Sequence, residues 1–212
     1  MIILDALMQN KCPYCGKPLK HGMTECNSCR ADFPEAPKKT VISCGDLCIA
    51  PFVYRDRAAK ALKDLKFRSI VFNSRSLGCA MAEALSHEYP RGTGADIIIS
   101  VPMTKARRRK RGFNQSELLA SELSKQTGIP FEKLLIRVVE SEHQHSLSLE
   151  ERKKHSKDYY RVTDNSRIKG KSILLVDDII TSGSTLSSCS QSLKDAGAKS
   201  ILCVVAAMTI IS

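Results

Sequence analysis

Hydrophobic positions along the chain alternate between helical and strand spacing from residue 46 onward. Apolar side chains between residues 58 and 67 recur at intervals of three and four, which predicts a helix. Residues 95–101 contain a short β-branched run that suits a buried strand. The same two patterns predict further helices at 76–89, 115–126 and 185–196, and strands at 47–54, 134–139, 172–176 and 201–208.

This alternation predicts an α/β fold with a mostly parallel sheet flanked by helices. Active sites in such sheets gather beyond the carboxyl ends of the strands. Residues 34–39, Pro-Glu-Ala-Pro-Lys-Lys, interrupt both periodicities and are interpreted as a linker. We therefore expect a small module with its linker at residues 1–40 and a larger domain at residues 41–212.

Composition narrows the class of partner. The 212 residues include 33 Lys and Arg against 22 Asp and Glu, a net charge of +11 that favours phosphorylated small molecules or nucleic acid. An aromatic content of 5% without tryptophan argues against an extensive base-stacking platform. Because no apolar stretch approaches about 20 residues and no secretory leader is visible, we expect no membrane insertion and a cytoplasmic location.

The cysteine spacing predicts a metal site. Two Cys-x-x-Cys pairs supply four cysteines: Cys12, Cys15, Cys26 and Cys29. Cytoplasmic thiols stay reduced, and four thiolates complete a tetrahedral zinc site with no open position for a catalytic water. The module is too small to fold on its own core, so we expect this zinc ribbon to be structural. Cys44 and Cys48 are either a further metal pair or buried, incidental thiols, and the second interpretation is favoured.

A ribose phosphate site is predicted after the apolar run at residues 173–176. Asp177 and Asp178 follow where that strand is expected to end, and the loop Thr181-Ser182-Gly183-Ser184-Thr185 comes after two apolar residues. Gly183 permits a tight turn, and the loop amides, hydroxyls and following helix N-terminus can converge on a phosphate. The acids would repel that anion, so we assign them to ribose hydroxyls, a divalent ion or a developing ribosyl cation. The alternative is an Asp pair followed by an ordinary helix-capping turn.

Residues 105–111 read Lys-Ala-Arg-Arg-Arg-Lys-Arg. Arg107, Arg109 and Arg111 are candidates to neutralise a pyrophosphate, because one guanidinium group can donate two hydrogen bonds to phosphate oxygens. The segment is equally suited to follow a single-stranded nucleic-acid backbone, and the third interpretation is a solvated charge run.

The apolar strand, acid pair and Thr-Ser-Gly-Ser-Thr loop resemble the fingerprint of the type I phosphoribosyltransferases. The resemblance implies that phosphoribosyl pyrophosphate binds here, with its 5′-phosphate in the loop Thr181–Thr185. It also implies that Asp177 and Asp178 hold the ribose hydroxyls and are the catalytic acids. Mg²⁺ accompanies the pyrophosphate in this family, with much of its coordination from substrate oxygens and water, as suits an ion that dehydrates reluctantly.

Over nearly its whole length the chain resembles the ComF family of competence-associated proteins. The resemblance rests on the zinc ribbon, the acid loop and the segment Val101-Pro102 to Arg111-Gly112-Phe113-Asn114-Gln115. Further matches lie at Arg137, Gln144, Leu147, Glu151 and Arg152, and departures lie at His155, in place of Asn, and Tyr160, in place of Phe. The resemblance implies a part in DNA uptake or natural transformation, beside a helicase-like partner.

Three functions therefore stay open. The leading hypothesis is a ComF-type protein that binds phosphoribosyl pyrophosphate with Mg²⁺ and, if active, is a glycosyltransferase. The alternatives are a non-catalytic single-stranded DNA-binding or scaffold protein that uses the pocket as a sensor, and a nucleobase-salvage phosphoribosyltransferase. No residue pattern identifies an acceptor, and His143, His145 and His155 are interpreted as polar surface positions.

Overall fold

The computed structural model describes residues 11–34, 36–138 and 159–209. Several residues discussed above lie outside these ranges: Val139, His143, Gln144, His145, Leu147, Glu151, Arg152 and His155.

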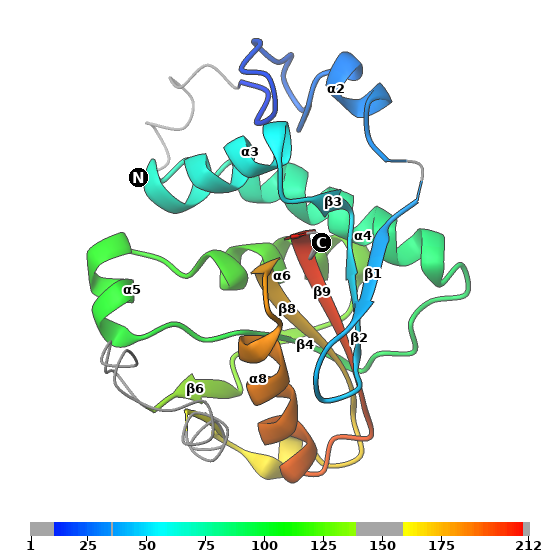
Figure 1. Cartoon of the computed structure of the whole chain (residues 1–212), viewed down its shortest axis with the longest axis vertical. Coiled ribbons are helices and arrows are strands. Elements are labelled where there is room, and N and C mark those ends of the chain that lie inside the picture. Colours follow the sequence, from blue (N-terminus) through cyan, green and yellow to red (C-terminus); the bar gives the residue numbers. More distant parts are fainter. Residues whose placement is uncertain (1–10, 35, 139–158, 210–212) are drawn as a thin grey trace.

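A seven-stranded, mostly parallel sheet forms the centre of the molecule (Figure 1). Its strands follow the order β1-β2-β9-β8-β4-β5, and β3 also pairs with β9. All pairings are parallel except that of β1 with β2. The strands are β1 Lys38–Val41, β2 Leu47–Ala50, β3 Phe52–Val53, β4 Ile97–Ser100, β5 Phe131–Glu132, β8 Ser172–Ile180 and β9 Ser200–Met208.

Helices cover both faces of this sheet. The helices α3 (Asp56–Phe67), α4 (Asn73–Glu88) and α6 (Gln115–Thr127) pack with Leu174 and Val176 of β8 in one core. On the other face, α8 (Ser184–Asp195) packs with Ile173 and Leu175. Successive β8 side chains thus enter opposite cores, as strand geometry requires. The predicted α/β fold is confirmed.

The predicted helices are present, with shifts of a few residues at their ends. More of the strand pattern differs. Leu135–Arg137 (β6) lies outside the main sheet and pairs antiparallel with Tyr160–Val162 (β7). The strand predicted at 47–54 is divided into β2 and β3, and the short strand β5 was not predicted. The proposed linker was also wrong in part, because Lys38 and Lys39 begin β1, where they pair with Ala50 and Ile49 of β2.

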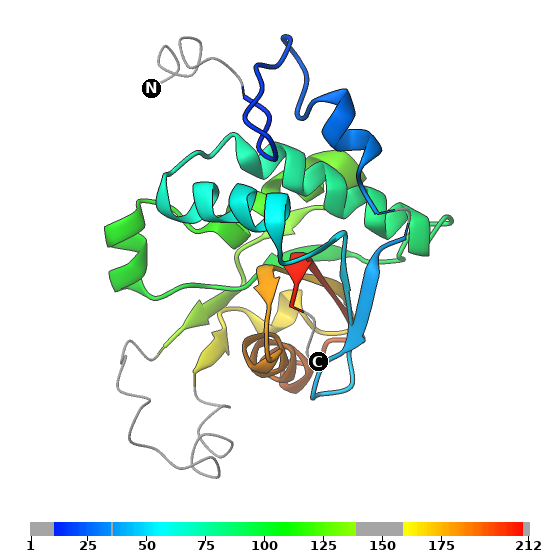
Figure 2. The same cartoon turned by 45° about the horizontal axis from the view of Figure 1, so that its top comes forward.

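The N-terminal module lies against helices α3 and α4 (Figure 2). It contains a short helix, α2 (Asn27–Ala31), and Tyr14, which is buried in the core shared with those helices. The rings of Tyr14, Phe33 and Phe52 meet edge to face, with centroids 4.9–5.7 Å apart. This cluster joins the module to β3. No helix in the described ranges has both the length and the apolar character needed to cross a bilayer.

Candidate functional site

The acid pair lies inside strand β8 rather than after it. The sequence suggested that the strand ended at Val176, but Ile179 and Ile180 continue the ladder opposite Ala207 and Met208 of β9. The neighbouring strand β4 is shorter, and its last residue, Ser100, pairs with Val176. Asp177 and Asp178 therefore lie just beyond the carboxyl end of β4, at the edge where parallel sheets place their ligands.

Asp177 is held from the side of helix α6. Its Oδ1 accepts a hydrogen bond from Ser116 Oγ at 2.7 Å and another from the Asp178 amide at 2.9 Å. Asn114 fixes the start of this helix by accepting from the Ser116 amide and donating to the Val101 carbonyl oxygen, each at 3.0 Å. Burial, together with the charge of Asp178, raises the pKa of Asp177 to about 7, although the Ser116 hydrogen bond acts to lower it.

Asp178 is held from the side of helix α3. Its Oδ2 lies 2.6 Å from Nζ of Lys66, and both side chains are largely buried, with exposures of 7% and 19%. Each acid of the pair thus contacts a different helix. Sequence reasoning missed both Ser116 and Lys66, because neither belongs to the acid loop and no local pattern points from helix to strand.

The loop after β8 has the shape expected of a phosphate-binding turn. Gly183 has a φ of 76°, which glycine adopts without the steric cost that other residues meet, and helix α8 begins immediately after it. Gly183 has no side chain to cap the helix, and the Ser184 amide donates to Ser182 Oγ at 3.5 Å. The other amides of a first helical turn have no partner within the helix. The hydroxyl-bearing residues around it are all exposed: Thr181, Ser182, Ser184 and Thr185. Amides and hydroxyls are therefore available together.

The hairpin between β1 and β2 packs against this loop and against helix α8. A Cβ atom on Gly183 would lie 3.2 Å from Cγ2 of Ile42, so the loop backbone packs closely against the hairpin. Ser43 Oγ donates to Ser187 Oγ in α8 at 2.7 Å, and Lys194 Nζ lies 2.8 Å from Asp46 Oδ1. The hairpin is thus fastened along helix α8.

Cys44 is part of the same hairpin, where its thiol donates to Asp46 Oδ2 at 3.0 Å. Burial acts to raise the pKa of Asp46, but hydrogen bonds, led by those from Cys44 and Lys194, lower it below its usual value. Cys48 is buried in β2. Across the described parts of the chain, the sulfur atoms close enough to share a metal ion belong to the four N-terminal cysteines.

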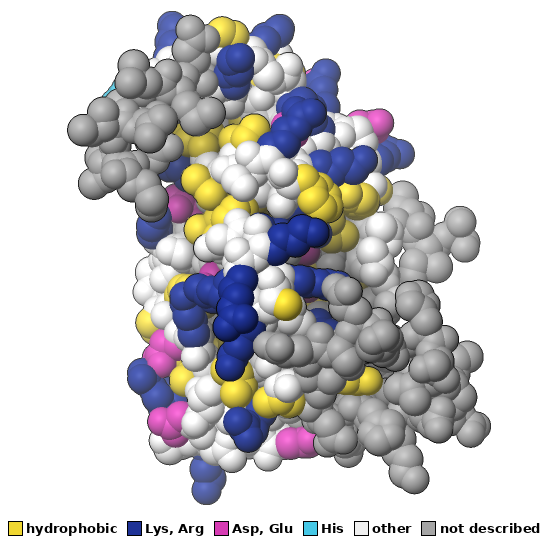
Figure 3. Space-filling view, turned by 90° about the vertical axis from the view of Figure 1, so that its left-hand side faces the viewer, with side chains coloured by type: hydrophobic (Ala, Val, Ile, Leu, Met, Phe, Trp, Pro, Cys, Tyr) yellow, Lys and Arg dark blue, Asp and Glu magenta, His cyan; other side chains and the backbone are white. Residues whose placement is uncertain are grey.

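The basic segment forms a short helix, α5 (Lys105–Arg111), in which every residue but Ala106 is cationic. Two of its arginines are engaged: Arg108 contacts Glu117 at 2.5 Å, and Arg111 donates to Gln115 Oε1 at 2.5 Å. Arg107 and Arg109 are exposed and make no side-chain hydrogen bond or ion pair within the described ranges. Figure 3 shows Lys and Arg side chains spread over this side of the molecule, with hydrophobic side chains between them.

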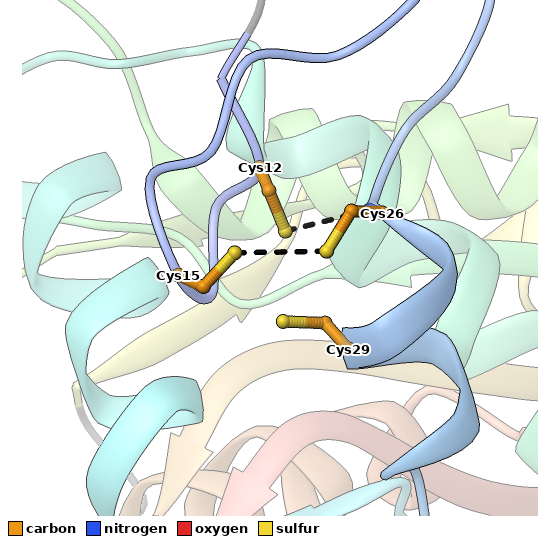
Figure 4. A group of neighbouring side chains, drawn as sticks. All are labelled: Cys12, Cys15, Cys26 and Cys29. Carbon is orange, nitrogen blue, oxygen red and sulfur yellow. Dashed lines mark hydrogen bonds between the residues drawn. The ribbon is translucent and has the colours of Figure 1, made fainter.

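The zinc-ribbon cysteines come together as predicted (Figure 4). Their four sulfur atoms all lie within 4.8 Å of one another, and those of Cys15 and Cys26 are 3.6 Å apart. Zn–S bonds of about 2.3 Å in a tetrahedron separate sulfur atoms by about 3.8 Å, so this set fits a zinc ion. The amide of Cys26 donates to Cys12 Sγ at 3.5 Å, and Arg57 of α3 reaches Cys29 Sγ at 3.7 Å.

Polar contacts complete the attachment of the module. Ser76 Oγ in α4 lies 2.9 Å from both the Tyr14 hydroxyl and Glu25 Oε2. Arg30 contacts Glu83 of α4 at 2.5 Å. A cavity of about 560 Å³ lies between module and domain, lined by Phe33, Phe52 and Arg57 among others. It is lined by none of the acid-loop residues, so it is distinct from the acid loop.

The comparisons with known proteins agree with this architecture. The phosphoribosyl transferase domain family matches residues 81–209, more than half of the chain. The DNA utilization protein YhgH of Salmonella typhimurium is 30% identical over 199 residues, which cover 90% of this chain and 80% of that protein. The competence protein ComFC of Bacillus subtilis is 27% identical over 187 residues, covering 88% of this chain and 72% of that protein.

Among solved structures, one similar protein is a glutamine phosphoribosylpyrophosphate amidotransferase from B. subtilis, complexed with ADP and GMP. The matched region covers 62% of this chain and 25% of the amidotransferase chain. The sequence identity is 23% and the TM-score 0.45.

Proposed function

This chain belongs to the phosphoribosyl transferase domain family and, with its competence and DNA utilization relatives, to the ComF group; on that premise we propose that it binds phosphoribosyl pyrophosphate together with Mg²⁺. The observation that carries the proposal is the placement of Asp177, Asp178 and the Gly183 turn at one carboxyl edge of the sheet. We further propose that binding serves DNA uptake or natural transformation, in the cytoplasm and beside a helicase-like partner.

The chemistry of each half of the site supports a ribose 5-phosphate. The backbone amides at the start of α8 and the hydroxyls of Thr181, Ser182, Ser184 and Thr185 would hold the 5′-phosphate. The carboxylates of Asp177 and Asp178 would accept hydrogen bonds from the ribose hydroxyls. A loop of amides and hydroxyls alone would suit any phosphate, so the acid pair is what favours a sugar phosphate.

Mg²⁺ would arrive with the ligand. Carboxylate oxygens suit this hard cation, but Oδ1 of Asp177 and Oδ2 of Asp178 already contact Ser116 and Lys66. The acids therefore fit a magnesium ion held mainly by pyrophosphate oxygens and water. When bound, Mg²⁺ would neutralise charge on the pyrophosphate, and the protein's own part is to orient the ribose below it.

Calorimetric titration with phosphoribosyl pyrophosphate and Mg²⁺ tests the proposal. We expect binding by the wild-type protein and a loss of at least about tenfold in the double variant Asp177→Asn/Asp178→Asn. Asp195→Asn, an exposed carboxylate at the far end of α8, is the matched control and should bind normally. Failure of the wild-type protein to bind, or equal binding by the double variant, would contradict the proposal.

A transferase must also release pyrophosphate. Incubating the protein with phosphoribosyl pyrophosphate, Mg²⁺ and each nucleobase in turn would identify an acceptor, and turnover with one base would favour nucleobase salvage. Binding without release in any of these mixtures would favour a sensor or scaffold.

A second candidate function is contact with single-stranded DNA through α5. The exposed Arg107 and Arg109, with no partners in the described chain, favour it over a purely structural role for the helix. Neutralising both should weaken DNA binding and reduce its salt dependence. Alanine at Lys171 and Lys199, exposed where β8 and β9 begin, is the matched control. Unchanged affinity at two salt concentrations would remove α5 from the interface.

A further inference from the structure

Lys66 differs from the other cations of helix α3 in what it contacts. Lys60 of α3 and Arg68, just after its end, both pair with Asp64 of this helix, at 2.8 Å and 3.4 Å. Arg57 pairs with Asp32 of the N-terminal module at 2.5 Å, and Lys63 is exposed. Lys66 instead reaches across to β8, where its ammonium group lies 2.6 Å from Asp178 Oδ2. It thus brings a cation into the acid-pair site from a helix outside the acid loop.

The contact leaves most of the donor capacity of Lys66 unused. An ammonium group has three N–H donors, and the contact that Lys66 makes in the described chain is with one carboxylate oxygen. Its side chain is 19% exposed, so it is largely buried beside the acid pair but not closed off from solvent. Such a group is well suited to bind an anion that enters the site.

A cation at this position also offsets the negative charge of the acid pair. The two carboxylates place up to two negative charges where the ligand must bring several more. Burial and the neighbouring acid raise the pKa of Asp177 to about 7, and the charge of Lys66 acts against this rise. Among the α5 arginines, Arg108 contacts Glu117 and Arg111 contacts Gln115, and in the described ranges neither Arg107 nor Arg109 makes a hydrogen bond or ion pair with the acid pair.

The chemistry of the ligand indicates which anion Lys66 would meet. In phosphoribosyl pyrophosphate, the carbon that bears the pyrophosphate is bonded directly to the carbon that bears the 2-hydroxyl. A cation in contact with a carboxylate that holds this hydroxyl is therefore beside the pyrophosphate as well. The 5′-phosphate, by contrast, lies at the opposite end of the ribose, toward the Gly183 turn.

We propose that Lys66 is a specificity-determining residue of this site: it pairs with Asp178 in the free protein and binds the pyrophosphate end of the ligand. The inference rests on the proposed function. Lys66 then distinguishes ribose phosphates that carry an anionic group on the anomeric carbon from those that do not. It also places a counter-charge against the Asp178 carboxylate, which faces the ribose.

The test compares two ligands that differ in the pyrophosphate alone. Phosphoribosyl pyrophosphate and ribose 5-phosphate are titrated in the presence of Mg²⁺ into wild-type protein and Lys66→Met. We expect at least a tenfold loss of affinity for the first ligand and less than a threefold loss for the second. Lys66→Arg should stay within about threefold of wild type for both ligands, because the charge is kept.

Lys63→Met, on the exposed side of the same helix, is the matched control and should bind both ligands as wild type does. If thermal melting shows that Lys66→Met does not fold, because the charge of Asp178 has lost its partner, Lys66→Gln replaces it in the same titrations. Unchanged or tighter binding of phosphoribosyl pyrophosphate by both neutral variants would overturn the inference, as would equal losses for the two ligands. A wild-type protein that binds neither ligand would instead overturn the proposed function, and the inference with it.

Discussion

Replacing Gly183 with alanine should affect the chain in two ways that can be separated. The residue has a φ of 76°, where a Cβ atom costs about 1–2 kcal/mol. The new Cβ would also lie 3.2 Å from Cγ2 of Ile42, closer than ordinary van der Waals contact, and 3.5 Å from Cδ1 of Ile180, which is an ordinary contact. Relieving this overlap requires a shift of a few tenths of an ångström, for which we expect about 1 kcal/mol more.

Gly170 provides the matched control. Its φ of 75° is nearly the same, but a Cβ there would meet nothing within 4 Å. Gly170→Ala therefore measures the backbone cost alone, and the difference between the two variants in the free energy of unfolding measures the contact with the hairpin. Urea denaturation followed by circular dichroism is the assay, with midpoints compared at unchanged slope.

Function should separate the two variants further. Gly183→Ala should weaken ribose 5-phosphate binding because the loop has to move away from Ile42, whereas Gly170→Ala should leave binding unchanged. In the double variant Gly183→Ala/Ile42→Ala, the clashing methyl group is gone, so a double-mutant cycle should show a favourable coupling of about 1 kcal/mol. Equal unfolding costs at Gly170 and Gly183, or additive effects in the cycle, would refute the close packing of loop on hairpin.

Three other changes have expected outcomes. Removing zinc with a chelator, or replacing Cys12 with serine, should unfold the N-terminal module and lower the melting temperature; an unchanged melting curve in metal-depleted protein would contradict a structural ion. The pKa of Asp177 is about 7 in the folded protein and ordinarily near 3.9 in an unfolded chain. Between these pH values the folded state binds one more proton than the unfolded state. The free energy of unfolding should therefore fall as pH rises from about 4 to 7. Asp177→Asn should flatten that slope, and a slope of equal size in the variant would assign it to other groups. Tyr14→Phe removes the hydrogen bond to Ser76 while keeping the aromatic cluster, and should cost about 0.5–1.5 kcal/mol in chemical denaturation; a larger loss, matching Tyr14→Ala, would mean that the hydroxyl and not the ring secures the module.

The sequence predicted the features that depend on local spacing. The helix stripes, the buried central strands and the two cysteine pairs are each determined within about 20 residues of chain. The acid loop could be identified for the same reason, since Gly183 and its hydroxyl neighbours are consecutive. The assignment of these residues to phosphoribosyl pyrophosphate, and the boundary at residues 40 and 41, stay predictions.

The features that were missed depend on contacts between distant parts of the chain. Ser116 contacts Asp177, and Lys66 contacts Asp178, across 61 and more than a hundred residues, and no periodicity encodes such a pair. The end of β8 was misplaced because an aspartate pair is usually a strand terminator. Here the isoleucines that follow have partners in β9, and pairing across the sheet outweighs the local preference.

The position of β9 between β2 and β8 has a consequence for folding during synthesis. Cys48 and Ile49 of β2 take as partners Cys203 and Val204, near the other end of the chain. During synthesis the four clustered N-terminal cysteines leave the ribosome long before β9 exists, so the N-terminal module can form first. Until β9 has been made, the edge of β2 that pairs with it stays unpaired. The sheet therefore closes only after β9 has been synthesised, and until then the unpaired edge of β2 is exposed to aggregation.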